Sequence, residues 1–244
     1  MSLIPRIYFP AATDLNATYT LDEDSAAHLL RVLRLGENAS IKVFNGMGKE
    51  FAAVLKNVQK KSADFMVQSC TRDESEPELK LHLGQVISKG DRMDFTIQKA
   101  TELGVAEITP LFSERCEVRL NNERMDKKIE HWQAVAVSAC QQSGRTYVPV
   151  IHEPVHFSQW CNTVQADLRL VLHPHQQQPL TKLATPKNIA LLIGPEGGFS
   201  ELEITQAMQQ SFTGLQLGPR ILRTETAALA ALSVLQYQWG DLGS

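Results

Sequence analysis

The fold is decided by the stretch Asn188-Ile-Ala-Leu-Leu-Ile-Gly-Pro-Glu-Gly-Gly-Phe-Ser-Glu-Leu-Glu203. Its first part is almost entirely apolar, which is typical of a strand that is buried on both faces of a parallel sheet. The glycines end this strand. Ser200 followed by Glu203 has the spacing of a capping box, which predicts that a helix begins at Ser200. The stretch therefore predicts a buried strand, a glycine-rich turn and a capped helix.

The glycine turn Gly194–Gly198 has two interpretations. In open α/β sheets, ligands bind beyond the carboxyl ends of the strands, and glycines at that place let a ligand approach the bare backbone. A tight turn that only needs positive φ would use the same glycines. The turn lacks the G-x-G-x-x-G spacing and a phosphate-loop lysine, which disfavours a dinucleotide or nucleoside triphosphate site. Geometry alone leaves the ligand site and the plain turn equally open.

A second glycine turn favours the ligand site. Leu217-Gly-Pro-Arg-Ile-Leu-Arg-Thr-Glu-Thr226 follows a predicted strand, Leu215–Leu217, and leads into a predicted helix, Thr224–Gln238, with Thr224 as N-cap. A third predicted strand, Leu168–Leu172, ends at His173. The carboxyl ends of parallel strands lie at one edge of a sheet, so these three strand ends can form the walls of one pocket.

The C-terminal part of the chain alternates predicted strands and helices. The further strands are Leu79–Ile87, Ile108–Phe112 and Ile189–Ile193, and the further helices are one capped by Asp91 and ended by Gly104, Glu123–Gln142 and Ser200–Gln210. Such alternation predicts the α/β class, with a parallel sheet covered by helices on both faces.

The N-terminal part is rich in short predicted strands, which indicates a small β-barrel. The strands are Arg6–Phe9, Ser40–Phe44, Phe51–Val58 and Ser62–Val67, with one helix over Asp22–Leu33. The acidic, proline-containing stretch Arg72–Glu78 separates this part from the next. We therefore expect two domains, residues 1–72 and residues 73–244.

Composition excludes several classes of protein. Of the 244 residues, 43% are hydrophobic, so the chain can bury a sizeable core and is not a disordered chain. No apolar run approaches the roughly 18 residues that a membrane span requires. The N-terminus has no apolar segment of a signal peptide, so we expect a cytoplasmic protein without a membrane partner.

Neither the cysteines nor the histidines predict a metal site. No pair of the four cysteines has C-x-x-C spacing. His152 and His156 lie four residues apart but lack the glutamate of an H-E-x-x-H motif. The net charge of -3 gives no global basic surface, although residues 1–72 have nine basic and seven acidic side chains. That balance permits an RNA-contacting N-terminal domain without establishing one.

The two glycine turns together resemble the signature of the SPOUT methyltransferases, in particular the family that methylates uridine N3 in bacterial 16S ribosomal RNA. The resemblance extends to Lys99-Ala-Thr-Glu-Leu-Gly-Val105, Ser113-Glu-Arg115, Gln141-Gln-Ser-Gly-Arg145 and His28-Leu-Leu-Arg-Val-Leu-Arg-Leu-Gly36. It therefore covers nearly the whole chain. The two C-terminal turns are its most specific part.

The resemblance implies a PUA-like RNA-binding domain at residues 1–72 and a SPOUT domain with a deep trefoil knot at residues 73–244. It also implies a homodimer with the cofactor pocket near the subunit interface. The small residues Ala227, Ala228, Ala230 and Ala231 would suit such an interface, or simply the core side of a helix. The implied cofactor is S-adenosyl-L-methionine, which gives S-adenosyl-L-homocysteine without a metal. The implied partner is 16S rRNA within the small ribosomal subunit.

The same resemblance implies the site residues. Those implied to bind the cofactor are Leu172, His173, Gly194, Pro195, Glu196, Gly197, Gly198, Leu217, Gly218, Ile221 and Leu222, with Ile221 on an apolar wall. Those implied to contact RNA are Arg31, Arg34, Lys89, Arg115 and Arg145, although each taken singly has the character of a solvated surface charge.

Arg223, Glu225 and Glu196 are the candidate catalytic residues. Uridine N3 carries a proton that must leave, so a carboxylate such as Glu225 or Glu196 can accept it if burial raises its pKa. Arg223 can stabilise a developing uridine anion. Glu225 also suits a helix's first turn, where a negative charge favours the dipole, and Glu196 can simply support its loop.

Two other functions stay open at this point. A SPOUT methyltransferase can act on another position, such as a ribose 2′-oxygen. A ribosome-assembly protein can bind RNA without catalysis.

Overall fold

A computed structural model of the chain describes residues 4–118, 122–173, 180 and 184–243, without the side chains of residues 122–124. The chain divides into two compact units. The first comprises Met1–Glu76 and Cys140–Val148, and the second comprises Pro77–Ala139 and Pro149–Ser244. The boundary predicted at residue 72 lies near the end of the last strand of the first unit. The predicted domain of residues 73–244 includes Cys140–Val148, whereas the structure assigns this segment to the first unit.

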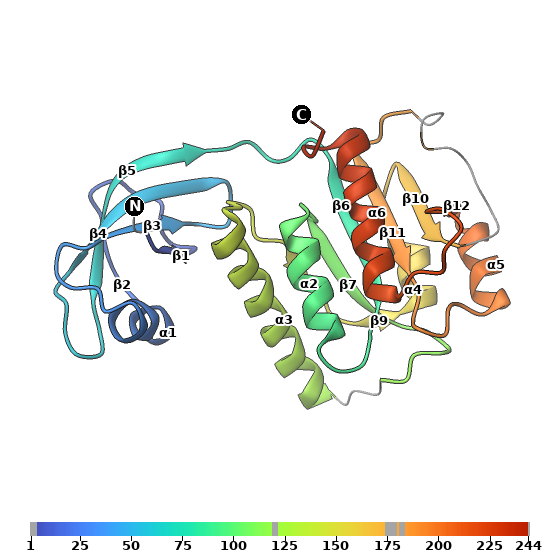
Figure 1. Cartoon of the computed structure of the whole chain (residues 1–244), viewed down its shortest axis with the longest axis horizontal. Helices are drawn as coiled ribbons and strands as arrows, with labels where there is room; N and C mark the ends of the chain where they lie inside the picture. Colours follow the sequence, from blue (N-terminus) through green and yellow to red (C-terminus); the bar gives the residue numbers. More distant parts are fainter. Residues whose placement is uncertain (1–3, 119–121, 174–179, 181–183, 244) are drawn as a thin grey trace. The chain divides into compact units, whose positions relative to one another are not determined.

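The first unit contains a curled five-stranded sheet with the order β1-β3-β4-β5-β2 (Figure 1). The strands are β1 (Arg6–Tyr8), β2 (Thr18–Thr20), β3 (Ser40–Phe44), β4 (Lys49–Lys56) and β5 (Asp64–Asp73). Ile41, Val43 and Leu55 are buried together with Phe65 because alternate residues of a strand point to the same face. The predicted strand-rich, barrel-like domain is confirmed, although β2 is not among the predicted strands.

The helix predicted over Asp22–Leu33 is wrong in its second half. An α-helix, α1, spans only Glu23–Ala27, and His28–Val32 forms a π-helical turn, η1. The wider turn ends with the Leu33 amide donating to the His28 carbonyl at 3.0 Å. Arg34 follows with a φ of 54°, a left-handed conformation that ends the helix. A π-turn of this kind cannot be recognised from apolar spacing alone.

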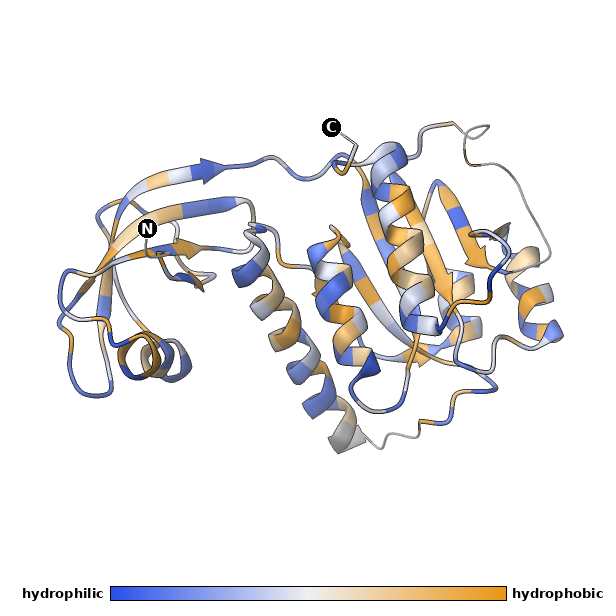
Figure 2. Ribbon diagram, in the orientation of Figure 1, coloured by the Kyte–Doolittle hydropathy of each residue, from blue (hydrophilic) through white to orange (hydrophobic). Residues whose placement is uncertain are grey.

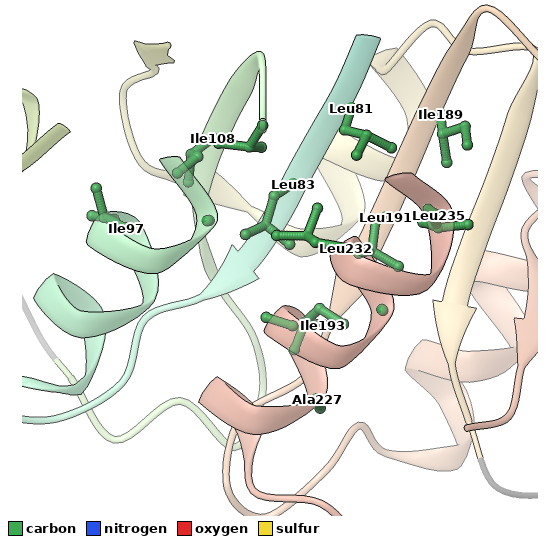
Figure 3. Packing of buried hydrophobic residues seen from close by; sticks show 14 of the residues in the cluster. Leu81, Leu83, Ile97, Ile108, Ile189, Leu191, Ile193, Ala227, Leu232 and Leu235 are labelled. Atoms are coloured by element: carbon green, nitrogen blue, oxygen red, sulfur yellow. The ribbon is translucent and has the colours of Figure 1, made fainter. Parts of the chain in front are cut away.

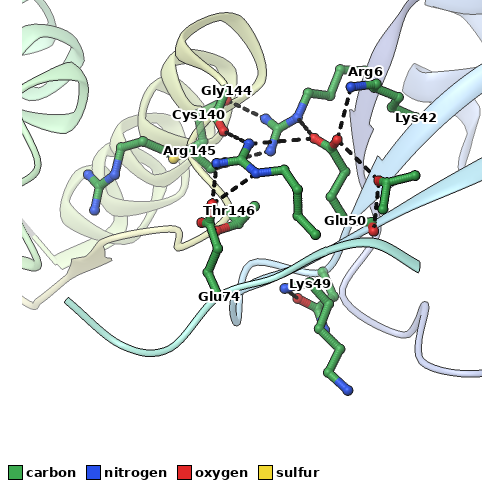
Figure 4. Close-up of polar contacts among 12 residues, drawn as sticks. Arg6, Lys42, Lys49, Glu50, Glu74, Cys140, Gly144, Arg145 and Thr146 are labelled. Carbon is green, nitrogen blue, oxygen red and sulfur yellow. Dashed lines mark hydrogen bonds and ion pairs between the residues drawn. The ribbon is translucent and has the colours of Figure 1, made fainter.

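A buried carboxylate organises one end of the first unit (Figure 4). Glu50 of β4 is 1% exposed and binds Arg6 Nε at 2.6 Å and Lys42 Nζ at 3.1 Å. Arg6 in turn donates to the carbonyls of Cys140 and Arg145 at 2.5 and 2.7 Å. The negative end of the helix dipole favours a cationic donor near the last turn of α3. Glu50 therefore orients an arginine that fastens the segment Cys140–Val148 within this unit.

A second arginine strengthens the same contact. Arg72 of β5 donates to the Gly144 carbonyl at 2.6 Å and forms an ion pair with Glu74. Glu74 also accepts a hydrogen bond from Thr146. Arg6 of β1 and Arg72 of β5 therefore hold the backbone of the segment, and Glu74 holds the side chain of Thr146 (Figure 4).

The second unit contains a seven-stranded parallel sheet within the described residues, with the order β12-β10-β11-β6-β7-β8, and β9 also pairs with β7. Its strands are β6 (Lys80–Val86), β7 (Glu107–Phe112), β8 (Val150–Ile151), β9 (Val155–His156), β10 (Leu168–Leu172), β11 (Asn188–Ile193) and β12 (Thr213–Leu215). Its helices are α2 (Arg92–Glu102), α3 (Asn122–Ser143), α4 (Phe157–Thr163), α5 (Glu201–Gln209) and α6 (Thr224–Trp239), and the end of α3 from Cys140 belongs to the first unit. The predicted α/β class is confirmed.

Strand β11 is buried on both faces, as predicted, and its ribbon is mostly coloured as hydrophobic (Figure 2). Ile189, Leu191 and Ile193 pack in one cluster with α2, α3 and α6 (Figure 3). Ala190 and Leu192 pack in another cluster with α4 and α5. Each fully buried Leu or Ile contributes about 1.5–3 kcal/mol, so this strand is central to the stability of the unit.

Gly84 of β6 makes room for an aromatic side chain of α4. A Cβ atom at this position would lie 2.6 Å from the ring of Trp160, which is 3% exposed. The absence of a side chain therefore lets α4 lie directly on the sheet.

Several local predictions need correction. Asp91 occupies the N-cap position of α2, but its backbone is helical (φ -79°, ψ -1°) and its side chain makes no capping hydrogen bond. An N-cap side chain needs an extended backbone to reach the first amides of the helix. Strand β12 ends at Leu215 instead of Leu217. The short elements β8, β9 and α4 are not among the predicted ones. No described helix is long and apolar enough to cross a membrane.

The Glu50 network gives a testable prediction. Burial raises the pKa of Glu50, but hydrogen bonds from Arg6 and Lys42 outweigh this effect and hold the pKa below its ordinary value. Glu50→Gln should lower the free energy of unfolding by about 3 kcal/mol at pH 7, since it breaks a buried ion pair. A carboxylate whose pKa is lowered on folding stabilises the folded state at every pH above its ordinary pKa. This stabilisation is lost as the pH falls from the ordinary pKa to the pKa in the folded state. Chemical denaturation of both proteins should therefore show their difference shrinking below about pH 4.5.

Asp73→Asn is the matched control because it breaks an exposed ion pair, between Lys49 Nζ and Asp73 Oδ2 at 3.6 Å. It should change the unfolding free energy by less than about 1 kcal/mol. If Glu50→Gln and the unmodified protein were equally stable at pH 7, the buried ion pair of Glu50 would not stabilise the fold.

Candidate functional site

A cavity of about 730 Å³ lies at the carboxyl ends of β10, β11 and β12 in the second unit. This is the position at which open α/β sheets bind ligands. Its lining includes all the predicted cofactor-binding residues, Leu172, His173, Gly194, Pro195, Glu196, Gly197, Gly198, Leu217, Gly218, Ile221 and Leu222, and the predicted catalytic residues Glu196, Arg223 and Glu225. The structure thus brings these residues together, while the role of each stays a prediction.

The first wall of the cavity is the glycine turn after β11. Gly198 has a φ of 67°, and its amide donates to the Pro195 carbonyl at 2.9 Å, which closes the turn. Apart from Gly198 and its two chain neighbours, no described residue has an atom within 4 Å of the position that a Cβ of Gly198 would occupy. Glycine therefore serves here both for its left-handed backbone and for the space that it leaves.

The predicted capping box fixes the turn from the other side. Ser200 Oγ accepts from the Glu203 amide at 3.3 Å, and Glu203 Oε2 accepts from the Ser200 amide at 2.9 Å. The other carboxylate oxygen of Glu203 accepts from the Glu114 amide at 2.8 Å. Glu203 is 7% exposed, so one buried carboxylate holds both the helix N-terminus and the loop after β7.

The second wall, residues 216–223, is tied to the first by Thr224. Thr224 Oγ1 donates to the Gly194 carbonyl at 2.6 Å and accepts from Gln85 Nε2 at 3.0 Å. The prediction of Thr224 as N-cap is wrong: Arg223 occupies that position with a ψ of 156°, and Thr224 is the first helical residue. The threonine hydroxyl forms its hydrogen bonds with Gly194, at the end of β11, and with Gln85 of β6, and not with the amides of α6.

The apolar part of the cavity is formed by partly buried leucines that pack on the core, Leu172, Leu217 and Leu222. Ile221, which the resemblance implies for this wall, lines the cavity but is 98% exposed. It therefore lies at the rim in this structure.

The polar groups of the cavity differ in their surroundings. Glu225 Oε2 is buried and has no hydrogen-bond partner among the described residues. Arg223 is exposed at the start of α6. Glu196 forms an ion pair with Arg92 Nη1 at 2.7 Å. Of these two candidate carboxylates, Glu196 is paired with Arg92, whereas Glu225 keeps a buried oxygen without a partner among the described residues.

A second cavity of about 720 Å³ adjoins the first and shares Arg92, Glu196 and Gly197 with it. Two of the predicted RNA-contacting residues line it. Lys89 forms an ion pair with Glu117, and Arg115 Nη1 donates to the Gly197 carbonyl at 2.8 Å. The exposed ion pair of Lys89 costs little to exchange for another anion.

The other predicted RNA contacts lie in the first unit. Arg31 and Arg34 are exposed on and after the π-helical turn, and Arg145 is half-buried beside the Glu50 network. The structure therefore separates the predicted set into two groups.

Arg92 is a site residue that the sequence analysis does not identify. It lines both cavities and pairs with Glu196 across the carboxyl end of β6. The rule that ligands bind beyond strand ends applies to β6 as well as to β10 and β11. Applied to the loop between β6 and α2, it would have indicated this arginine.

Comparison with known proteins gives two matches to family models. Residues 75–236 match an RNA methyltransferase domain, and residues 21–67 match an RNA methyltransferase PUA domain. Ribosomal RNA small subunit methyltransferase E of Buchnera aphidicola subsp. Schizaphis graminum is 37% identical, over 98% of this chain and 98% of the relative. The protein of that name from Bacillus subtilis is 32% identical, over 91% of this chain and 90% of the relative.

Solved structures agree with this comparison. Ribosomal RNA small subunit methyltransferase E from Neisseria gonorrhoeae, bound to S-adenosyl methionine, has a TM-score of 0.91 and 38% identity, and the match covers 98% of this chain and 100% of that one. A Legionella pneumophila protein in complex with the bound cofactor SAM has a TM-score of 0.94 and 42% identity, with the same coverage.

The hydroxyl of Thr224 gives the second prediction. Thr224→Val keeps the shape of the side chain but removes the donor to the Gly194 carbonyl and the acceptor for Gln85. It should lower the free energy of unfolding by about 2 kcal/mol because buried polar groups lose their partner. Thr224→Ser keeps the hydroxyl and is the control. If chemical denaturation gives the valine and serine variants the same stability, the hydrogen bonds do not hold the two walls together.

Proposed function

The chain belongs to the RNA methyltransferase family, and on this premise we propose that it transfers a methyl group from S-adenosyl-L-methionine to N3 of a uridine in 16S rRNA. The family match covers residues 75–236. The observation that carries the proposal is the cavity of about 730 Å³ that both glycine turns line, together with Glu225, whose Oε2 has no partner among the described residues. The second product is S-adenosyl-L-homocysteine.

The cavity fits a ligand of this size and chemistry. Small-molecule sites have volumes of roughly 300–1,000 Å³ and combine an apolar lining with a few polar groups. The glycine turn Gly194–Gly198 offers backbone, and Leu172, Leu217 and Leu222 offer the apolar surface. We assign cofactor binding to these residues together with His173 and Gly218. When bound, the cofactor supplies an electrophilic methyl group.

The remaining chemistry is the removal of the N3 proton, and we assign this step to Glu225. A general base needs an unoccupied acceptor within reach of the proton. Glu225 lines the cavity, and its Oε2 has no partner among the described residues. Because this oxygen is buried, the carboxylate would turn toward the cavity to accept the proton. Glu196 is less suited because Arg92 already binds it at 2.7 Å. Arg223 would stabilise the negative charge that develops on the uracil oxygens.

We assign RNA contacts to each of the two units separately. Lys89 and Arg115 line the cavity that adjoins the cofactor site, and Arg31, Arg34 and Arg145 lie in the unit that holds the PUA match. Phosphate contacts of this kind position a substrate without reading its sequence. The target uridine would have to leave its base stack to expose N3. In this proposal residues 1–72 bind RNA and residues 73–244 catalyse. A substrate in the small ribosomal subunit implies a cytoplasmic protein.

We further propose that the chain acts as a homodimer through α6. Its outward face has Val234 and Tyr237 at 40% and 70% exposure, and Leu229 and Ala230 beside them are half-buried. Glu225 is the only charged residue of the helix. An uncharged helix face with exposed apolar side chains is typical of an interface. The trefoil knot stays a prediction of the resemblance.

Cofactor binding and the target nucleotide test the function. Calorimetry should detect S-adenosyl-L-homocysteine binding to the purified protein, since the cavity needs no RNA to exist. Mass mapping of 16S rRNA from a strain lacking the gene should show the loss of one methyl group on a uracil base. Absence of nucleoside binding, or a missing methyl on a ribose, would overturn the proposal.

Substitutions at the two catalytic candidates test the mechanism. Glu225→Gln should lower the single-turnover methylation rate by roughly 100-fold or more, as the loss of a general base does. Arg223→Met should lower it by a similar factor because it removes the charge but keeps the length. Both variants should bind S-adenosyl-L-homocysteine like the unmodified protein. Glu201→Gln removes a carboxylate from the first turn of α5 and should keep the full rate. If Glu225→Gln kept the full rate, Glu225 would not be the general base, and its charge would only favour the dipole of α6.

A further inference from the structure

Three side chains that metals favour meet at the amino end of the parallel sheet, opposite the carboxyl-end cavity. His82 lies near the start of β6, Glu107 is the first residue of β7, and His152 follows β8 directly. Their ligand atoms all lie within 4.8 Å of one another. We propose that these residues bind one divalent transition-metal ion, of the chemical class of Zn²⁺.

The distances suit such an ion. Glu107 Oε2 lies 2.7 Å from His152 Nε2 and 3.8 Å from His82 Nδ1. Zn²⁺ binds nitrogen and oxygen ligands at about 2.0–2.2 Å, so tetrahedral ligands lie roughly 3.3 Å apart. The two measured distances lie on either side of this value. The ligand atoms of His82 and His152 lie within 4.8 Å of each other, so the two rings would have to approach by up to about 1.5 Å to bind the ion.

The surroundings of His82 orient it for this role. Its Nε2 lies 2.7 Å from Thr109 Oγ1 on β7, and Thr109 is 3% exposed. The hydrogen bond directs the other ring nitrogen toward Glu107. Metal-binding histidines nearly always have such a partner, which fixes the ring and its tautomer. The His82 ring also makes an edge-on contact with Trp160, at 5.4 Å between ring centroids.

The register of the sheet creates the cluster. His82 pairs with Glu107, and Glu107 pairs with Val150, two residues before His152. Two of the ligands therefore come from the adjacent strands β6 and β7, and the third follows the neighbouring strand β8. Their separation in sequence shows no metal-binding motif. Strand β8 contains only Val150 and Ile151. A bound ion would fasten this short edge strand to the sheet.

A matched pair elsewhere in the unit shows what distinguishes the cluster. His131 Nε2 binds Asp94 Oδ2 at 2.6 Å, and the other oxygen of Asp94 accepts from Trp132 Nε1 at 3.0 Å. This is also a histidine and a carboxylate in contact, but no third metal ligand from the described residues joins them within the same distance. The contact between His131 and Asp94 is therefore a simple ion pair. Glu107 and His152, in contrast, have His82 beside them as a third metal ligand.

Zn²⁺ titration of the chelator-treated, full-length protein tests the proposal by calorimetry. The unmodified protein should bind one ion per chain, and Zn²⁺ should raise its melting temperature by mass action. Thr109→Val should weaken binding by roughly 10–100-fold, as the loss of a supporting hydrogen bond does. Glu107→Gln and His152→Ala remove a ligand and should weaken it at least as much, while His131→Ala should leave it unchanged.

Absorption spectra of the Co²⁺-loaded protein give a second test, which reports directly on the atoms that bind the metal. The proposal expects visible bands of a low-coordinate site in the unmodified protein and in His131→Ala, and their loss in Glu107→Gln. Metal-free melting curves check that Glu107→Gln, which keeps the side-chain shape, is folded. No Zn²⁺ binding by the unmodified protein, or equal affinity in Glu107→Gln, would overturn the proposal. Methyl transfer plays no part in this test, so its result is independent of the proposed function.

Discussion

The hydrogen bond from Thr224 to the Gly194 carbonyl is the contact on which the site depends. At 2.6 Å it joins the end of β11 to the first residue of α6, and Gln85 of β6 binds the same hydroxyl at 3.0 Å. Thr224 is 5% exposed and Gln85 is fully buried. Polar groups at such burial are costly when unpaired, so the three elements hold one another in place. The cavity between the two glycine turns exists because this junction is fixed.

The packing of the sheet determines where this junction lies. Strand β11 buries Leu191 against α2, α3 and α6 and Leu192 against α4 and α5. A strand fixed on both faces cannot shift its register without exposing one hydrophobic set. Its carboxyl end therefore has a defined position, and the glycine turn that follows inherits it. The buried core of the sheet stabilises the unit, and the carboxyl ends of its strands position the cavity.

The sequence predicts those features that depend on local pattern. The apolar run of β11 and the pair Ser200 and Glu203 follow from side-chain type and spacing, and both are present as expected. The prediction of Thr224 as N-cap was wrong because a hydroxyl at a helix start can serve the helix or a neighbouring strand. Only the tertiary contact with Gly194 decides between these uses.

Other features lie beyond any local pattern. The π-helical turn at His28–Val32 has the same apolar spacing as an ordinary helix. Arg92 enters the site through an ion pair with Glu196, which lies far from it in the chain. His82, Glu107 and His152 become neighbours only through strand register. These residues illustrate that long-range pairing, rather than residue type, decides which polar groups meet.

The joint action of the two glycine turns can be measured by amide hydrogen exchange with and without S-adenosyl-L-homocysteine. If both turns bind one ligand, amides of residues 194–199 and of residues 216–223 should gain protection together at the same ligand concentration. The amides around His82 and Glu107, at the opposite end of the strands, should exchange as before. Protection of one turn alone, or of neither, would contradict a single cavity built from both.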